Sequence, residues 1–215
     1  MDARFGVVNI PNVIWIDEEG MIVRPPEPGW GGPTALPASL LRRAAATQVE
    51  AEGDESPEAQ RAREEQAAAA ARQRENLASG QDREAYPDAI RDWVEQGAAS
   101  EVALSPDEVV ARSQPRPMSK SEGAAHFELA VHLWHHGARD AAIAHFNECN
   151  RLQPDNWTYK RQAWSLIGSE QAGDNELGRF MQGPAPGNED NWPFDSDFRT
   201  DVAKLGPGEY YPKTM

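Results

Sequence analysis

Residues 5–24 read FGVVNIPNVIWIDEEGMIVR and decide how the first part of the chain folds. Residues 12–16 form an apolar run rich in β-branched side chains, and residues 21–24 form a second run. The turn between them ends at Gly20, which can adopt the positive φ of a tight hairpin turn. The stretch therefore predicts a β-hairpin. Because the first run does not alternate between apolar and polar residues, we expect it to be covered on both faces.

A loop and then a charged segment are predicted after this hairpin. Residues 25–37 hold five prolines and three glycines, a density that predicts a loop. Residues 38–80 are rich in alanine and in charges of both signs. Ser56 as a cap and Pro57 at the first helical position predict a helix that runs to Leu77. Because this helix has almost no large apolar side chain, we expect it to be an exposed insertion.

Two shorter helices are predicted next. Residues 86–97 carry apolar side chains at helical spacing and end at a glycine. Ser105 and Glu108 form a capping box that begins a short helix. Residues 114–117 contain two prolines and predict a linker. The apolar face of the first of these helices comprises Tyr86, Ile90, Trp93 and Val94.

The strongest helical periodicity lies in the second half of the chain. Ser119 and Glu122 form a second capping box, which predicts a helix that ends at Gly137. Another helix is predicted up to Pro154, and Asp155 is the expected cap of a third. The apolar positions of these helices are Phe127, Ala130, Val131, Trp134, Ala141, Ala142, Ile143, Phe146, Cys149, Leu152, Trp157, Ala163, Trp164 and Ile167.

The C-terminal residues have a different composition. Within 170–201, eight acids and two arginines lie among glycine, proline and asparagine. This composition predicts an irregular tail over 170–215. Trp192, Phe194 and Phe198 are the aromatic side chains of this tail that can dock on the helices.

Composition excludes several classes of protein. The 215 residues carry a net charge of −14 and a mean hydropathy of −0.71, which allows a modest core and disfavours phosphate-binding nucleic-acid proteins. We find no apolar run long enough to span a membrane and no secretory leader. The single cysteine, Cys149, excludes an internal disulfide, a CxxC pair and a cysteine-based zinc cluster. We expect a cytoplasmic protein that binds neither nucleic acid nor membrane.

The hairpin stretch resembles the second half of a thioredoxin-like domain of the redoxin or thiol–disulfide reductase type. The resemblance rests on residues 5–11, the strand from Val13 to Asp17 and the strand over 21–24. In that family the apolar residue and proline at Ile10 and Pro11 form a cis-proline loop that hydrogen-bonds an extended substrate backbone. The helix over 86–97 looks like the closing helix of that family.

The resemblance also implies that part of the family's fold is missing. The first strands, the long first helix and the CxxC motif of the family would lie upstream of Met1. The chain is therefore expected to be N-terminally truncated. Either its start is misplaced, or the chain is a genuine remnant whose hairpin exposes a sheet edge.

A second stretch resembles one tetratricopeptide-like repeat. The small and aromatic residues of its two helices, and the proline that closes the repeat, match that pattern within 34 residues. About three such units are needed for independent stability, so the helices are expected to pack on another part of the chain. The residues that keep the spacing are Leu129, Ala130, Leu133, Ala142, Phe146 and Pro154, with His126 in place of the family's tryptophan.

Together these patterns predict an α/β chain with four parts. A partial thioredoxin-like ββα fragment occupies 1–98 and contains the helical insertion at about 38–80. A linker with a short helix follows over 99–118. The all-α tetratricopeptide-like unit occupies 119–169, and the irregular acidic tail occupies 170–215.

The candidate site residues follow from the two resemblances. Ile10 and Pro11 are the expected substrate-binding residues, by resemblance to the cis-proline loop. We expect no catalytic residue, no metal ligand and no cofactor. The candidates for partner binding on the first repeat helix are Phe127, Val131, Trp134 and His135.

Two other groups carry weaker chemical hypotheses. His132 and His136 lie four residues apart on the first repeat helix, with Glu128 one turn earlier, so a metal site is an alternative to a solvated helix face. Cys149 is expected to lie between helices, buried and inert.

The predicted function is that of a non-catalytic thioredoxin-like and tetratricopeptide-like interaction protein with a protein or peptide partner. The alternative is a thiol–disulfide oxidoreductase or peroxide-type redoxin whose catalytic cysteine half lies upstream of the start. One thiol cannot close a disulfide-exchange cycle, so the sequence favours a protein without enzymatic activity of its own. The oligomeric state is not predicted.

Overall fold

The computed structural model describes residues 5–29, 57–77, 85–113, 117–172, 182–184 and 189–211. These residues form a mixture of helix and sheet, as the sequence predicts. No helix among them is both long and apolar enough to cross a lipid bilayer. The described elements are β1 (Asn12–Ile16), β2 (Ile22–Pro28), α3 (Pro57–Asn76), α4 (Ala85–Gln96), η1 (Gly97–Ala99), α5 (Pro106–Arg112), α6 (Met118–His135), α7 (Arg139–Leu152), α8 (Trp157–Ala172), η2 (Glu189–Asn191) and α10 (Phe198–Val202).

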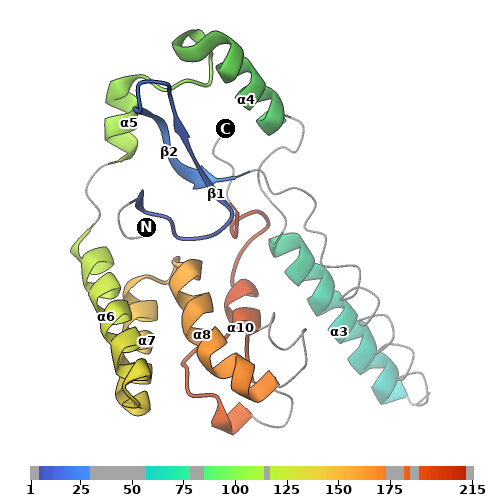
Figure 1. Cartoon of the computed structure of the whole chain (residues 1–215). Helices are drawn as coiled ribbons and strands as arrows, with labels where there is room; N and C mark the ends of the chain where they lie inside the picture. Colours follow the sequence, from blue (N-terminus) through green and yellow to red (C-terminus); the bar gives the residue numbers. More distant parts are fainter. Residues whose placement is uncertain are drawn as a thin grey trace.

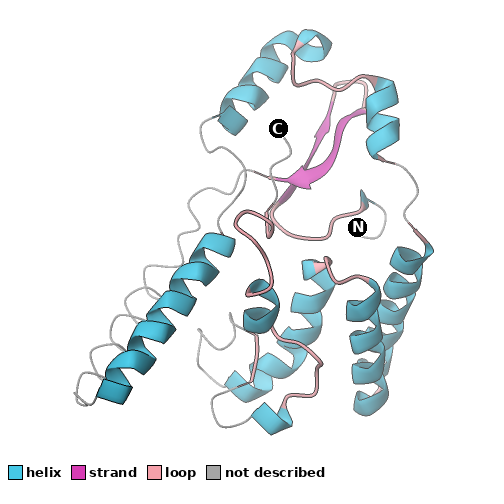
Figure 2. Ribbon diagram, turned by 180° about the vertical axis from the view of Figure 1, so that it is seen from behind, coloured by secondary structure: helices cyan, strands magenta, loops and turns pink. Residues whose placement is uncertain are grey.

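The elements form two groups joined by the N-terminal segment. The hairpin lies with α4 and α5 at one end of the molecule, and α6, α7, α8 and α10 form a helical group at the other (Figure 1). Residues 5–11 run between the hairpin and the tops of the helices in both views (Figure 2). α3 extends to one side. The N-terminal segment is therefore placed to contact both groups.

The predicted hairpin is confirmed. β1 pairs antiparallel with β2, and Gly20 in the turn has φ +80°. The Asp17 carboxylate accepts hydrogen bonds from the backbone N–H of Glu19 at 3.1 Å and of Met21 at 2.7 Å. The turn is therefore held by an aspartate side chain as well as by the freedom of glycine.

Two details of the hairpin differ from the prediction. β2 continues to Pro28, although residues 25–37 were expected to form a loop; residues beyond 29 in that range lie outside the described part. Prolines are tolerated because the register shifts between the pairs Val13–Glu27 and Trp15–Arg24, so the ladder is already irregular at Pro25 and Pro26. β1 is not covered on both faces: Ile16 is 53% exposed.

α4 covers one face of this hairpin. Trp15 is buried, with its ring centroid 6.2 Å from that of Tyr86 and 5.1 Å from that of Trp93. The expected apolar face of α4 is correct for these residues but not for Val94, which is 70% exposed. A two-stranded sheet is too narrow to cover the full width of that face.

The helix caps are partly as predicted. The Ser105–Glu108 capping box is present at the start of α5, and Gly137 ends the α6 turn with φ +80°. The box predicted at Ser119 and Glu122 is absent, because α6 begins earlier, at Met118, without a side-chain cap. Asn156, not Asp155, caps α8: its Oδ1 accepts a hydrogen bond from the Tyr159 N–H at 3.1 Å.

The core lies in the helical group and is aromatic. The Phe127 and Tyr159 rings stack with centroids 4.1 Å apart, and Phe146 and Trp164 are fully buried. The small residues at the helix crossings, Ala130 and Ala142 among them, are also fully buried. The aromatic residues of the C-terminal segment complete this core: Phe194, Phe198 and Tyr210.

α3 is present over the predicted range and is attached at its C-terminal end. Most of its described side chains are exposed, as the lack of large apolar residues predicts. Asn76 is buried, and its side chain donates a hydrogen bond to the Val202 carbonyl at 3.0 Å. Leu77 packs against the helical core. The attachment of α3 to the helical group therefore depends on a few contacts at its C-terminal end.

Candidate peptide-binding edge

The segment before β1 is fixed at three points. The Val8 carbonyl accepts a hydrogen bond from the Thr158 N–H in the first turn of α8, at 3.1 Å. The buried Asn9 side chain donates to the Tyr210 carbonyl at 2.8 Å. The Tyr211 hydroxyl donates to the Ile10 carbonyl at 2.8 Å. The loop is therefore positioned by α8 and by the C-terminal segment.

The Ile10–Pro11 peptide bond, which the resemblance assigned to a substrate-binding loop, is cis. The Ile10 side chain is 64% exposed and Pro11 is exposed. The backbone of Ile10 already has partners within the chain, because its N–H donates to Asn9 Oδ1 at 2.9 Å and its carbonyl accepts from Tyr211. At Ile10 and Pro11, a partner can therefore contact apolar side-chain surface rather than the backbone of Ile10.

The edge of β1 that faces away from β2 is not paired with another strand in the described part of the chain. Pro11 O accepts from the Gly29 N–H at 3.2 Å, and the Asp17 N–H donates to Met21 O at 3.0 Å, so these residues face β2. The backbone groups of alternate residues point to opposite edges of a strand. Asn12 and Ile14 therefore direct their N–H and C=O groups to the other edge, with which no described strand pairs.

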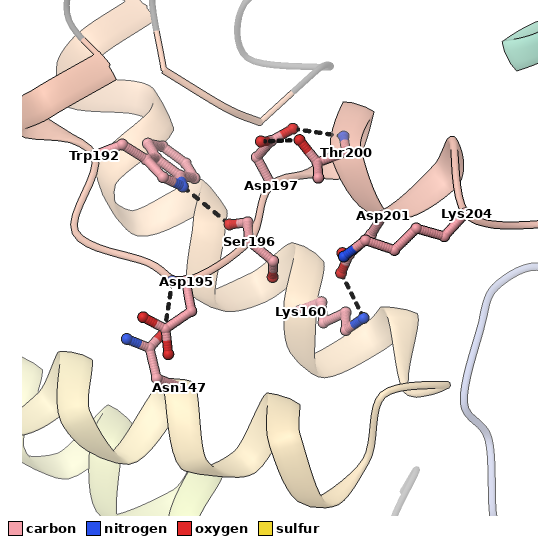
Figure 3. A network of polar contacts seen from close by, with 9 residues as sticks. All are labelled: Asn147, Lys160, Trp192, Asp195, Ser196, Asp197, Thr200, Asp201 and Lys204. Carbon is pink, nitrogen blue, oxygen red and sulfur yellow. Dashed lines mark hydrogen bonds and ion pairs between the residues drawn. The ribbon is translucent and has the colours of Figure 1, made fainter.

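A buried ion pair holds the C-terminal segment that supports the loop (Figure 3). Lys160 Nζ of α8 lies 2.6 Å from Asp201 Oδ2 of α10, and Lys204 Nζ lies 2.8 Å from Asp201 Oδ1. The Lys160 and Asp201 side chains are each only 7% exposed. Burial acts to raise the pKa of Asp201, but the hydrogen bonds from the two lysines outweigh burial and lower this pKa below its usual value.

Further polar contacts continue this anchor (Figure 3). Asn147 Oδ1 of α7 accepts from the Asp195 N–H at 3.3 Å, and Trp192 Nε1 donates to Ser196 O at 2.9 Å. The Asp197 side chain caps α10 by accepting from the Thr200 N–H at 2.9 Å. These contacts hold residues 192–204 against α7 and α8.

A polar pocket of about 570 Å³ lies along this anchor. Its lysines are paired with Asp201, and Arg151 is paired with Glu148. Because each of these cations already faces a carboxylate, we interpret the pocket as part of the support of the C-terminal segment. The lining residues are Ala144, Asn147, Glu148, Asn150, Arg151, Pro154, Lys160, Asp195, Ser196, Asp201 and Lys204.

The four partner-binding candidates on α6 do not share one open face. Phe127 is buried in the aromatic core, so a partner cannot reach it. Val131 and Trp134 are half-buried, and the guanidinium carbon of Arg139 lies 4.7 Å from the Trp134 ring centroid. His135 is exposed. Periodicity identified the apolar face of α6 correctly, but this face is largely used for packing within the chain.

The other residues with predicted chemistry are also located. Cys149 is 1% exposed, and burial raises its pKa to about 12. The His132 and His136 rings are tilted by 31° with centroids 4.1 Å apart, and His136 Nδ1 lies 2.7 Å from the carbonyl of His132. Among the described residues, no group of three or more histidine, cysteine, aspartate or glutamate side chains is arranged to hold a metal ion.

The residues that position the loop were not found from the sequence. Asn9, Tyr210 and Tyr211 belong to no periodic pattern, and their partners lie at the opposite end of the chain. Only the nearness of Asn9 to Pro11 gave a signal. Comparison of the chain with protein-family models, with curated proteins and with solved structures finds no significant match.

Proposed function

We propose that this chain is a non-catalytic interaction protein that binds an extended segment of a partner protein along the free edge of β1. The observation that carries this proposal is the edge of β1 at Asn12 and Ile14 with which no described strand pairs, and this edge begins at a loop held at three points. Extended peptides commonly bind by adding a strand to such an edge, with main-chain hydrogen bonds that supply affinity.

The energetics favour an added strand. A two-stranded hairpin is marginal by itself, so a third strand stabilises it as well as binding the partner. Each new main-chain hydrogen bond contributes about 1 kcal/mol net. Exposed apolar side chains flank both ends of the edge: Ile10 at one end, and Ile16 and Met21 at the other. Burial of each of these side chains contributes about 1.5–3 kcal/mol.

Charge favours a basic partner. Asp17, Glu18 and Glu19 follow β1 directly in the hairpin turn, and the whole chain carries a net charge of −14. An acidic field attracts basic segments and slows the approach of acidic ones. The expected partner segment therefore combines apolar side chains with lysine or arginine.

The resemblances are consistent with this function. In the thioredoxin-like reading, Ile10 and Pro11 belong to a loop that holds an extended peptide, and α4 is the closing helix over the hairpin. In the tetratricopeptide-like reading, α6 and α7 are a helical unit that supports the hairpin and the loop before β1. The only thiol of the chain, Cys149, is buried with a pKa of about 12, which leaves it unsuited to disulfide exchange.

The experiment that tests the proposal measures the affinity of the chain for a short peptide of alternating lysine and valine. Ile14→Pro removes the outward N–H and leaves the β1–β2 ladder intact, so we expect it to abolish binding. Ile14→Thr, the matched control, keeps the N–H and a β-branched side chain, so binding should persist. A peptide in which glutamate replaces lysine should bind more weakly. Absence of binding by the unmodified protein, or equal binding by the proline variant, contradicts the proposal.

A further inference from the structure

Two histidines on neighbouring helices face each other in the helical group. His126 of α6 and His145 of α7 have their Nδ1 atoms 2.8 Å apart, and their ring centroids are 4.9 Å apart. Both side chains are half-buried. At this distance one ring donates its Nδ1 proton and the other presents its Nδ1 lone pair. Two imidazole nitrogens therefore already converge on one point between α6 and α7.

We propose that His126 and His145 bind one divalent transition-metal ion across α6 and α7 through their Nδ1 atoms. Neutral imidazole nitrogen is a preferred ligand of Zn²⁺, Ni²⁺ and Cu²⁺ and a poor ligand of Mg²⁺ and Ca²⁺. The ion replaces the hydrogen bond between the rings. The ring that carries a proton at Nδ1 gives it up to water and takes one at Nε2, so both rings remain neutral.

The surroundings favour a cation. Glu122 lies four residues before His126 on α6, and Glu148 lies three residues after His145 on α7, so each carboxylate is one turn from a ligand. Two arginines of α7, Arg139 and Arg151, each lie six residues from His145. Arg151 Nε donates to Glu148 Oε2 at 2.8 Å, and the guanidinium carbon of Arg139 lies 4.7 Å from the Trp134 ring centroid, so both are engaged away from the histidine pair. Because no third histidine, cysteine, aspartate or glutamate side chain converges on the point within the described residues, water completes the coordination.

The second histidine pair is less suited to the same chemistry. His132 and His136 lie on one helix and are both exposed. His136 Nδ1 is directed at the carbonyl of His132, so only Nε2 of His136 is left for a ligand. An ion there would bind one helix only and would not connect two. This pair is therefore the natural internal control.

The test is a calorimetric titration of the full chain with ZnCl₂, repeated with CaCl₂. We expect one Zn²⁺ per chain, no binding of Ca²⁺, and a melting temperature that rises with zinc because the ion joins α6 to α7. His126→Gln and His145→Gln should each abolish zinc binding, whereas His132→Gln/His136→Gln should leave it unchanged. Circular dichroism of each variant checks that the helices are retained.

A second readout identifies the ligands directly and does not depend on variant stability. In the unmodified protein, zinc should shift the ring NMR signals of His126 and His145 and leave those of His132 and His136 in place. Zinc binding that survives in His126→Gln/His145→Gln, zinc shifts confined to His132 and His136, or the absence of zinc binding overturns the proposal.

Discussion

Gly29 ends β2 at a point where a side chain does not fit. A Cβ at this position would lie 2.6 Å from Cγ2 of Val13, and the Gly29 N–H donates to Pro11 O at 3.2 Å. Val13 is β-branched and has little rotamer freedom with which to move away. We therefore expect Gly29→Ala to destabilise the protein by about 1–3 kcal/mol, measured by urea unfolding.

A double-mutant cycle isolates this contact. Val13→Ala removes the clashing methyl group, so Gly29→Ala should cost much less in the Val13→Ala background than alone. Effects that simply add would show that the close approach of these two residues is not the cause.

Gly123 allows α6 to lie close to Gln153. A Cβ on Gly123 would lie 2.7 Å from Gln153 Nε2 and 2.8 Å from its Cγ. Gln153 is 1% exposed, and its side chain donates to Lys120 O at 2.7 Å and accepts from Asn156 at 3.0 Å, so it has little room to move. Gly123→Ala gains about 1 kcal/mol of helix propensity, yet we expect a net loss of stability in thermal unfolding.

The stability difference between alanine and glycine that comes from helix propensity alone can be measured at a neighbouring position of α6. Ala125 is exposed, so Ala125→Gly reports the propensity difference without a packing change. A stabilising effect of Gly123→Ala, equal in size and opposite in sign to that of Ala125→Gly, would show that Gln153 adapts freely.

At the scale of elements, α10 is joined to α8 by the pair of Lys160 and Asp201. The pKa of Asp201 is lowered below its usual 3.8, so the pair contributes stability above that pH, and this contribution is lost as pH falls through the lower folded-state value. Asp201→Asn leaves the buried ammonium of Lys160 without a carboxylate partner and should lower stability at neutral pH by about 3 kcal/mol.

The pH dependence distinguishes the ion pair from simple packing. Unfolding free energies measured from pH 7 down to below pH 4 should show a smaller loss in Asp201→Asn than in the unmodified protein. Asp195→Asn, an exposed carboxylate on the same pocket, is the matched control and should change little. Parallel pH profiles for the unmodified protein and Asp201→Asn would refute this assignment.

At the scale of the whole molecule, Tyr211 connects the C-terminal segment to the loop before β1. Burial raises the pKa of Tyr211 to about 12, so its hydroxyl remains a donor to Ile10 O throughout the ordinary pH range. Tyr211→Phe should cost about 1 kcal/mol of stability. It should also speed hydrogen exchange at the Ile10 amide and weaken peptide binding at β1, because the loop is less fixed.

Val110→Ala, an exposed change on α5, is the control for this experiment. Unchanged exchange at Ile10 in Tyr211→Phe would mean that Asn9 and Thr158 hold the loop without the hydroxyl.

The sequence predictions that are confirmed concern interactions between residues close together in the sequence. The hairpin turn at Gly20 and the capping box at Ser105 depend on residues that lie within a few positions of each other, and both are present. The caps expected at Ser119 and Asp155 are wrong, because neighbouring residues begin those helices instead. Val94 is exposed because the two-stranded sheet does not cover the whole apolar face of α4. The helical periodicity of α4 does not indicate how wide that sheet is.

The sequence by itself determined the hairpin, most of the helices, the charge and the unsuitability of a single cysteine for disulfide exchange, since these depend on composition and on local spacing. The prediction of an irregular tail over 170–215 was wrong at α10 (Phe198–Val202), whose apolar residues Phe198 and Val202 are buried against the helical core. Only the tertiary structure decided where the sites lie. Asn9 meets Tyr210 across 201 residues, Lys160 meets Asp201 across 41, and His126 meets His145 across two helices. Which side chains meet at such separations depends on how the helices pack, and no periodicity along the chain encodes that choice.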